Sequence, residues 1–165
     1  MKLENLNALF VQQLRDLYSA ENQLIEALPK LASKATEPSL KKAFEGHLKE
    51  TKKHAERIET ILKDLGEKAE GETCKAMKGL VAEGAEMMKA DADSDVMDAG
   101  LIADAQRVEH YEIAAYGTVC TYAKELGLDS AQKLLEQTLQ EEKNANDKLT
   151  DIATGKVNAR AAQYA

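Results

Sequence analysis

The chain has few of the residues that build sheets and sharp turns. Its 165 residues include no tryptophan, two phenylalanines, five tyrosines, two prolines and nine glycines. An all-β sandwich needs a turn signal roughly every 8–12 residues, so this composition excludes that class. Basic residues are also outnumbered, 22 against 29 acidic ones, which gives a net charge of −7. Such a surface repels nucleic acid and anionic membranes.

Two further absences concern the compartment. No stretch approaches the ~18 consecutive apolar residues of a membrane span, and the start Met1-Lys2-Leu3-Glu4 does not resemble a signal peptide. The two cysteines, Cys74 and Cys120, lie far apart and form neither a CxxC motif nor a disulfide framework. We therefore expect a cytoplasmic protein that binds neither nucleic acid nor membranes.

The sequence instead has helical periodicity over nearly its whole length. The spacing predicts long helices over about 5–34, 38–65, 95–126 and 129–154, and a shorter helix over about 74–90. Gly66 and Gly127 are expected to end two of them. Thr73 and Asp129 are expected N-caps, the latter in a capping-box-like start.

The lengths of the connections predict the topology. Short loops join the first pair and the last pair of long helices, which therefore form antiparallel hairpins. The long middle connection has room to cross the molecule. We expect an all-α fold, a ferritin-like four-helix bundle with one long crossover that carries an extra short helix. Residues 1–165 would form a single domain, with about 155–165 as a frayed tail.

Acidic residues interrupt the apolar stripe of every long helix near its midpoint. Because the midpoints of antiparallel helices of similar length meet at one level, these side chains should converge. Histidines interrupt the stripe of the second helix in the same way, with a glutamate just beside them. The set comprises Glu21, His47, Glu50, His54, Glu109, Glu112 and Glu142.

Five carboxylates in one core require compensation. Burying an isolated ionised carboxylate costs far more than the ~2–7 kcal/mol of an unpaired neutral polar group, and no lysine or arginine falls on the same stripes. One such glutamate is more often a boundary residue that reaches water, but four helices doing so at one level is much less common. Oxygen-rich ligands with a little nitrogen suit iron, or alternatively manganese, better than zinc. We predict one or two ions per chain, with either His47 or His54 as the imidazole ligand.

Three neighbouring side chains are expected to lie outside this centre. His110 and Glu141 are rotated off the buried faces, so Glu141 should be solvated. Tyr116 lies one turn beyond Glu112 and is expected mainly to pack in the core, with contact to a metal ligand or a redox role as the lesser alternatives.

Four short segments resemble those of the YciF-like family of bacterial ferritin-like proteins, and the similarity covers nearly the whole chain. The resemblance implies a ferritin-like bundle, a homodimer and an association with bacterial stress responses. The segments are Tyr-Ser-Ala-Glu21-Asn-Gln-Leu, His47-Leu-Lys-Glu50-Thr, Val-Glu109-His-Tyr-Glu112-Ile-Ala-Ala-Tyr-Gly-Thr and Glu141-Glu142-Lys.

The wider ferritin-like superfamily implies a ligand pattern that this sequence matches only in part. The pattern has one Glu on each of two helices and Glu-x-x-His on the other two. Glu21, Glu50 and Glu142 match glutamates of that pattern, and Glu50 and Glu142 would bridge two ions. Lys53 and Ala145 stand where its histidines are expected. The centre is thus richer in carboxylate than the usual one.

Two functions of different classes follow. The first is a stress-associated metalloprotein with a di-iron or di-manganese type carboxylate centre that handles iron, dioxygen or peroxide. It would need an external electron donor, because rubredoxin-type cysteine pairs are absent from the sequence. The second is a structural or interaction protein whose acidic site is vestigial or holds metal only for stability. The sequence favours metal binding and leaves open whether any reaction is catalysed.

Overall fold

The computed structural model describes residues 3–69 and 72–164, of which no residue is in a strand. The expected loop over residues 67–72 and both expected ends of the chain therefore include positions outside the described residues. Five helices of more than two turns are present in the described ranges: α1 (Leu6–Lys34), α2 (Pro38–Asp64), α3 (Lys75–Met87), α4 (Ser94–Glu125) and α5 (Asp129–Ile152). These bounds agree with the predicted helices to within about three residues.

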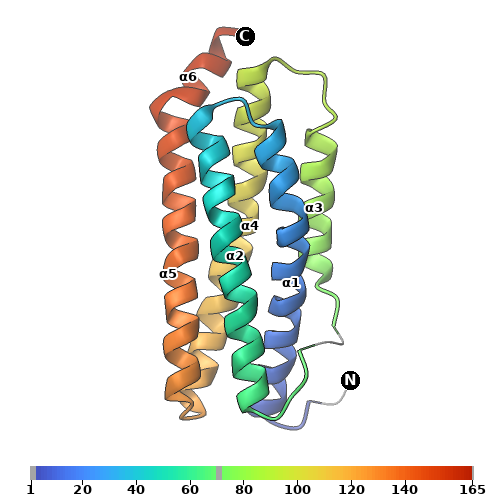
Figure 1. Cartoon of the computed structure of the whole chain (residues 1–165), viewed down its shortest axis with the longest axis vertical. Coiled ribbons are helices and arrows are strands. Elements are labelled where there is room, and N and C mark those ends of the chain that lie inside the picture. Colours follow the sequence, from blue (N-terminus) through green and yellow to red (C-terminus); the bar gives the residue numbers. More distant parts are fainter. Residues whose placement is uncertain (1–2, 70–71, 165) are drawn as a thin grey trace.

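The four long helices form an antiparallel bundle with one long crossover. In Figure 1, α1 and α5 run upward while α2 and α4 run downward, and the chain returns from the foot of α2 to the head of α4 through α3. Helix α3 packs on the outside of α1 and α4, and α2 lies beside α5. Helices α2 and α4 are consecutive long helices and run parallel, so the connection between them must cross the length of the bundle. This is the ferritin-like arrangement that the connection lengths predict.

The helix ends show why the chain turns where it does. Gly66 and Gly127 have φ angles of +74° and +68°, a left-handed conformation that glycine adopts without steric cost, and they end α2 and α4 as predicted. The expected N-caps of α3 and α5 are wrong. Cys74, not Thr73, caps α3 by accepting from the Met77 amide. Asp129 is already helical and follows Leu128, which makes no side-chain cap.

A buried aspartate fixes the turn between α1 and α2. The Asp98 side chain, fully buried on α4, accepts hydrogen bonds from the backbone amides of Thr36 and Glu37 at 2.9 and 2.8 Å and from the Thr36 hydroxyl at 2.6 Å. Charge-assisted bonds of this kind are the stronger ones. They hold the start of α2 against α4, which sets the register of the two hairpins.

Residues 155–164 of the expected frayed tail are instead helical. After α5 the chain continues through a π-helical turn (Ala153–Val157), the short helix α6 (Asn158–Ala161) and a 3₁₀ turn (Ala162–Tyr164). Val157 is fully buried in the core. Lys156 and Arg160 pair with the buried carboxylate of Glu37 at 2.6 and 2.8 Å. The sequence pattern missed this because the anchor, Glu37, lies more than a hundred residues away.

The Glu37 contacts predict a specific acid sensitivity. Hydrogen bonds from Lys156 and Arg160 lower the pKa of Glu37 to about 2, from an ordinary value of 4.5. A carboxyl with a lowered folded-state pKa stabilises the fold above its unfolded pKa and loses this contribution as the pH falls toward the folded value. Both partners are half exposed, so solvent screening keeps this contribution small.

We therefore expect Glu37→Gln to be less stable than the parent at pH 6 and to lose less stability between pH 6 and pH 2.5. Urea denaturation at both pH values measures the two free energies of unfolding. Glu45→Gln, at an exposed position of the same helix, is the matched control and should follow the parent. Equal losses in Glu37→Gln and the parent would contradict the prediction.

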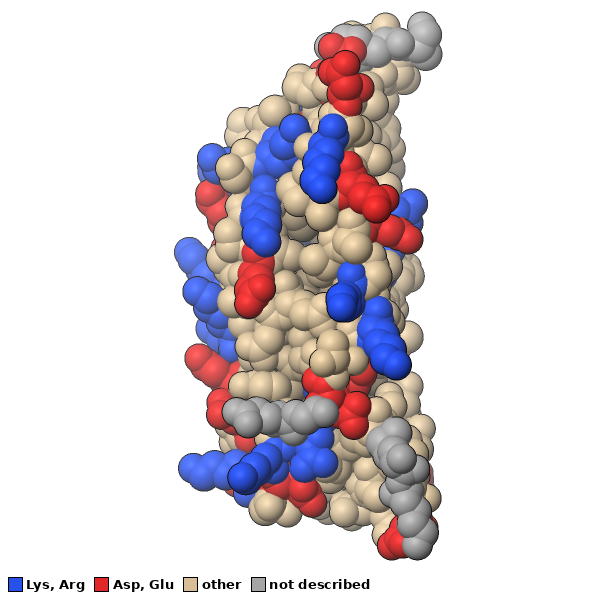
Figure 2. All heavy atoms as spheres, turned by 90° about the vertical axis from the view of Figure 1, so that its right-hand side faces the viewer, with Lys and Arg blue, Asp and Glu red and all other residues tan. Residues whose placement is uncertain are grey.

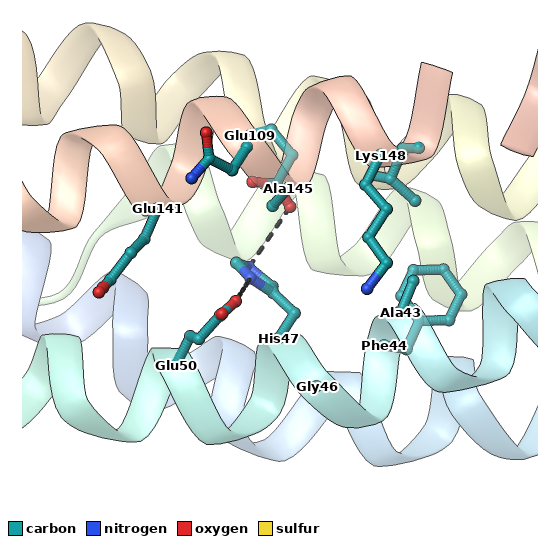
Figure 3. A pocket seen from close by; sticks show the side chains of 11 residues that line it. Ala43, Phe44, Gly46, His47, Glu50, Glu109, Glu141, Ala145 and Lys148 are labelled. Carbon is teal, nitrogen blue, oxygen red and sulfur yellow. Dashed lines mark ion pairs between the residues drawn. The ribbon is translucent and has the colours of Figure 1, made fainter. Parts of the chain in front are cut away.

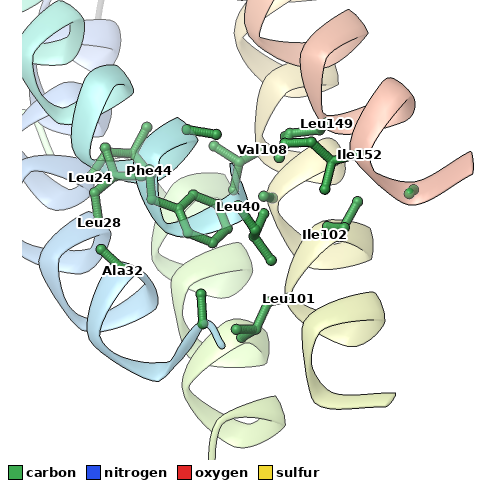
Figure 4. Packing of buried hydrophobic residues seen from close by; sticks show 14 of the residues in the cluster. Leu24, Leu28, Ala32, Leu40, Phe44, Leu101, Ile102, Val108, Leu149 and Ile152 are labelled. Atoms are coloured by element: carbon green, nitrogen blue, oxygen red, sulfur yellow. The ribbon is translucent and has the colours of Figure 1, made fainter. Parts of the chain in front are cut away.

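The core consists of two apolar clusters separated along the bundle axis. One lies toward the α1–α2 turn and includes Leu28, Leu40, Leu101 and Ile152, which point toward one another from four helices (Figure 4). The other lies toward the opposite end and is built around Phe10 and neighbours on the same helices. In every long helix, the polar residues that interrupt the apolar stripe of the sequence lie between the two clusters.

On the outside, the charges are mixed. Figure 2 shows that basic and acidic side chains are interspersed over the face that contains α3. Among the described helices, none combines the length and the apolar character needed to cross a bilayer. Both cysteines are buried free thiols.

Candidate metal centre

The layer between the two apolar clusters contains six buried ionisable side chains from four helices. Glu21 of α1, His54 of α2, Glu112 of α4 and Glu142 of α5 are fully buried. Glu109 and His47 are 3% and 7% exposed. Each lies within about two helical turns of a buried apolar residue of its own helix that belongs to one of the clusters, so packing of the apolar clusters fixes the level of all six.

These side chains form two groups that share one carboxylate. His47, Glu109, Glu112 and Glu142 each offer an atom within 4.8 Å of the others, and so do Glu21, His54 and Glu142. Glu142 Oε2 lies 3.6 Å from His47 Nε2, while its other oxygen, Oε1, lies 2.8 Å from His54 Nδ1. Its two oxygens thus face different groups, the geometry of a bridging carboxylate.

Most of the candidate ligand atoms of this layer lack hydrogen-bond partners. Among the described residues, no hydrogen bond reaches either oxygen of Glu112 or Glu142, either ring nitrogen of His47, or Nδ1 of His54. His54 Nδ1 is close to Glu142 but not aligned for a hydrogen bond. Buried polar groups are nearly always satisfied, and a cation among oxygens and imidazole nitrogens would satisfy these. The residues are therefore compatible with a metal site.

Burial and mutual repulsion strain the ionised carboxylates. Desolvation, followed by the charges of Glu142 and Glu21, raises the pKa of Glu112 well above its usual range. Desolvation also raises the pKa of Glu109 to about 8. Burial acts to lower the pKa of His54, but Glu142 and Glu21 outweigh it and raise the pKa to about 10. In the metal-free protein, bound protons must therefore neutralise the negative charge of this layer, and a metal ion would displace those protons.

Glu141 is part of this surrounding, contrary to the expectation that it is solvated. Its Oε2 lies 2.9 Å from His54 Nε2, and Arg57 donates to both of its oxygens, at 2.5 and 3.1 Å. A carboxylate that accepts from Nε2–H leaves Nδ1 of the same ring free to act as a ligand. The i+3 spacing places His54 and Arg57 on the same side of α2, and this could be read from the sequence. Their shared partner, Glu141, lies on α5, so the sequence pattern of α2 alone could not indicate it.

Tyr116 is fully buried, as expected, and also makes a polar contact. Its hydroxyl donates a short hydrogen bond to Glu21 Oε1. Oε2 of that carboxylate has no hydrogen-bond partner among the described residues and lies 3.7 Å from His54 Nδ1. Tyr116 therefore fixes the orientation of one candidate ligand. His110 is exposed and bonds the Gln106 carbonyl of its own helix, so it lies outside the layer.

Of the seven residues proposed from the sequence, the structure brings six together and leaves Glu50 outside both groups. Glu50 is 47% exposed, and its carboxylate lies 3.6 Å from His47 Nδ1. Both histidines that the sequence left as alternatives join a group, His47 the larger one and His54 the smaller. The bridging position that the resemblance implied for Glu50 is not favoured by this geometry, since only Glu142 belongs to both groups.

The fold and the buried layer of carboxylates and histidines define a ferritin-like protein. The chain belongs to the family described as a domain of unknown function, DUF892, whose model matches residues 5–162.

Relatives of known structure agree with this assignment. Protein YciF of Escherichia coli (strain K12) is 44% identical over 162 residues, 98% of each chain. The crystal structure of that protein, described as a stress protein, superposes with a TM-score of 0.91 over 94% of this chain and 99% of its own.

Two further structures extend the comparison. YcfI from Rhodopseudomonas palustris, described provisionally as a structural protein, is also 44% identical. It has a TM-score of 0.87 and covers 90% of this chain and 95% of its own. A two-domain protein from Anabaena variabilis with a ferritin-like domain is 20% identical. Its TM-score is 0.61, over 91% of this chain and 37% of its own. That last likeness concerns the fold alone.

Proposed function

We propose that the chain is a ferritin-like metalloprotein of the bacterial stress response, with one or two iron or manganese ions in its buried polar layer. The observation that carries this proposal is the set of buried carboxylate and imidazole atoms, where four helices meet, that have no hydrogen-bond partner in the described part of the chain. The description of the Escherichia coli relative as a stress protein supports the biological setting.

The residues of the chain would divide the work of such a centre. Glu142 would hold both ions, with His47, Glu109 and Glu112 on one side and Glu21 and His54 on the other. Glu141 and Tyr116 would orient His54 and Glu21. The two apolar clusters would exclude bulk water from above and below. Bound iron would supply redox chemistry toward dioxygen or peroxide.

The setting of the protein is part of the same proposal. Free, buried Cys74 and Cys120 are consistent with a reducing, cytoplasmic compartment. The homodimer implied by the resemblance is also proposed. Redox turnover would need an external electron donor.

A structural role without turnover is the second candidate. The description of the Rhodopseudomonas palustris relative favours it. The metal content tests the vestigial form of this candidate, because a vestigial site would not load, whereas a site that holds metal only for stability would load without any turnover of dioxygen or peroxide.

The direct test is elemental analysis of protein purified without chelators and then loaded anaerobically with Fe²⁺ or Mn²⁺. Size-exclusion chromatography with light scattering should precede the measurement, so that ions per chain and molecular mass come from the same peak. We expect one or two ions per chain. A loaded content below a few tenths of an ion per chain would overturn the metal proposal and favour the structural candidate.

A further inference from the structure

A cavity of about 220 Å³ opens between α2 and α5 and reaches the larger of the two metal-ligand groups. Its inner wall contains His47 and Glu109. Its outer wall contains the half-exposed Glu50 together with Asn144 and Lys148, both exposed. Figure 3 shows Glu50 and Glu109 on opposite sides of the His47 ring, each joined to it by an ion pair. The cavity thus connects solvent to the buried layer.

Small residues keep this passage open. Gly46 on α2 and Ala145 on α5 both line the cavity. A Cβ atom placed on Gly46 would meet no atom within 4 Å, so the space is not already filled by a neighbouring side chain. Protein interiors are otherwise close-packed, with few voids larger than a water molecule.

The polar atoms along the passage point to a cation. Both ring nitrogens of His47 and Oε2 of Glu109 are buried and lack hydrogen-bond partners within residues 3–69 and 72–164. Glu141, at the side of the cavity, is already paired with Arg57. The lining has three carboxylates, Glu50, Glu109 and Glu141, and its one ammonium group is Lys148. Glu50 and Glu109 contact only the His47 ring, at 3.6 and 3.4 Å, among the ion pairs of the described residues.

We infer that this cavity is the entry route for divalent cations, and that Glu50 is an outer ligand that passes the ion through His47 to Glu109, Glu112 and Glu142. The inference rests on the proposed metal centre. It also gives Glu50 a role that its exposure and its place outside both ligand groups suit better than a bridging role. The ion keeps at least one carboxylate or imidazole contact along the whole path, which limits the cost of dehydration.

The test separates the rate of loading from the affinity. Metal-free protein would be mixed anaerobically with Co²⁺, and the visible absorption of the bound ion would be followed by stopped flow and by equilibrium titration. Glu50→Gln should slow loading by about tenfold, the low end of electrostatic effects on association, with little change in the dissociation constant. Lys148→Gln should speed loading. Ala145→Leu, which fills the passage, should slow it more than Glu50→Gln does.

Ala131→Leu is the matched control, because it makes the same change on the same helix. Ala131 lines a different hollow, at the α4–α5 turn. The control should load at the parent rate. Should Ala145→Leu fail to fold, the half-exposed Glu50→Gln still decides the question.

Parent-like loading by Glu50→Gln, or equal loading rates in Ala145→Leu and its control, would overturn the route. The route would also be overturned if Ala145→Leu loaded Co²⁺ at the parent rate while its iron-loaded form consumed dioxygen more slowly than the parent. That result would assign the cavity to a small oxidant. A parent that binds no Co²⁺, Mn²⁺ or Fe²⁺ at equilibrium would instead refute the metal centre itself.

Discussion

Replacing Glu142 by alanine is expected to abolish metal binding at both groups. Of the residues that the structure describes, Glu142 alone belongs to both, and its two oxygens face His47 and His54 separately. The loss of affinity should exceed the 10–100-fold that removal of an orienting outer residue typically costs. No neighbouring carboxylate can replace it, because Glu141 points to the outer nitrogen of His54 and is held by Arg57.

Single variants on either side of Glu142 should show a graded response. Glu21→Ala alters only the smaller group and Glu109→Ala only the larger one, so each should lose one ion and keep the other. Titration with Mn²⁺, with free Mn²⁺ followed by electron paramagnetic resonance, gives both stoichiometry and affinity. Glu136→Ala, at an exposed position of α5, is the control. Retention of full stoichiometry by Glu142→Ala would show that Glu142 does not bridge.

Glu112→Leu is expected to stabilise the metal-free protein while it weakens metal binding. Glu112 is fully buried, and neither of its oxygens has a hydrogen-bond partner among the described residues. Burial and three neighbouring glutamates raise its pKa well above the usual range. Replacing buried ionic groups by apolar residues of similar volume often stabilises by about 1–4 kcal/mol, and Glu112→Leu should fall within that range.

The same change at Glu21 should not give this gain. Glu21 accepts a hydrogen bond from the buried Tyr116 hydroxyl, and leucine would leave that donor unsatisfied at a cost of about 1–3 kcal/mol. Urea denaturation with a chelator present measures both free energies of unfolding. Glu125→Leu, at the exposed end of α4, should be near neutral.

Measurements with added metal separate the effect of these substitutions on metal binding from their effect on the stability of the fold. An ion that binds only the folded state at 100 times its dissociation constant stabilises it by about 2.7 kcal/mol. This gain should appear in the parent and be much smaller in Glu112→Leu. A metal-free Glu112→Leu protein that is less stable than its parent would contradict the view that this carboxylate is kept at a cost to folding.

The sequence by itself determined the fold class, the helix lengths and the level of the polar layer. These features depend on local periodicity, on the two glycines Gly66 and Gly127, and on connection lengths. Antiparallel helices of similar length align their midpoints, so the interruptions at Glu21, Glu109 and Glu142 are expected to meet in one layer. No knowledge of individual contacts was needed for that step.

Tertiary structure alone decided which atoms meet within that layer. Glu50 and His54 are four residues apart on one helix, yet only His54 reaches the centre, because a rotation of a few tens of degrees about the helix axis separates solvent from core. The pairing of Glu141 with Arg57, and the docking of Lys156 and Arg160 on Glu37, join residues 84 or more positions apart. Periodicity reports the face of one helix, whereas such pairs depend on the rotation and register of two helices. That rotation and register are set by the packing of the whole core.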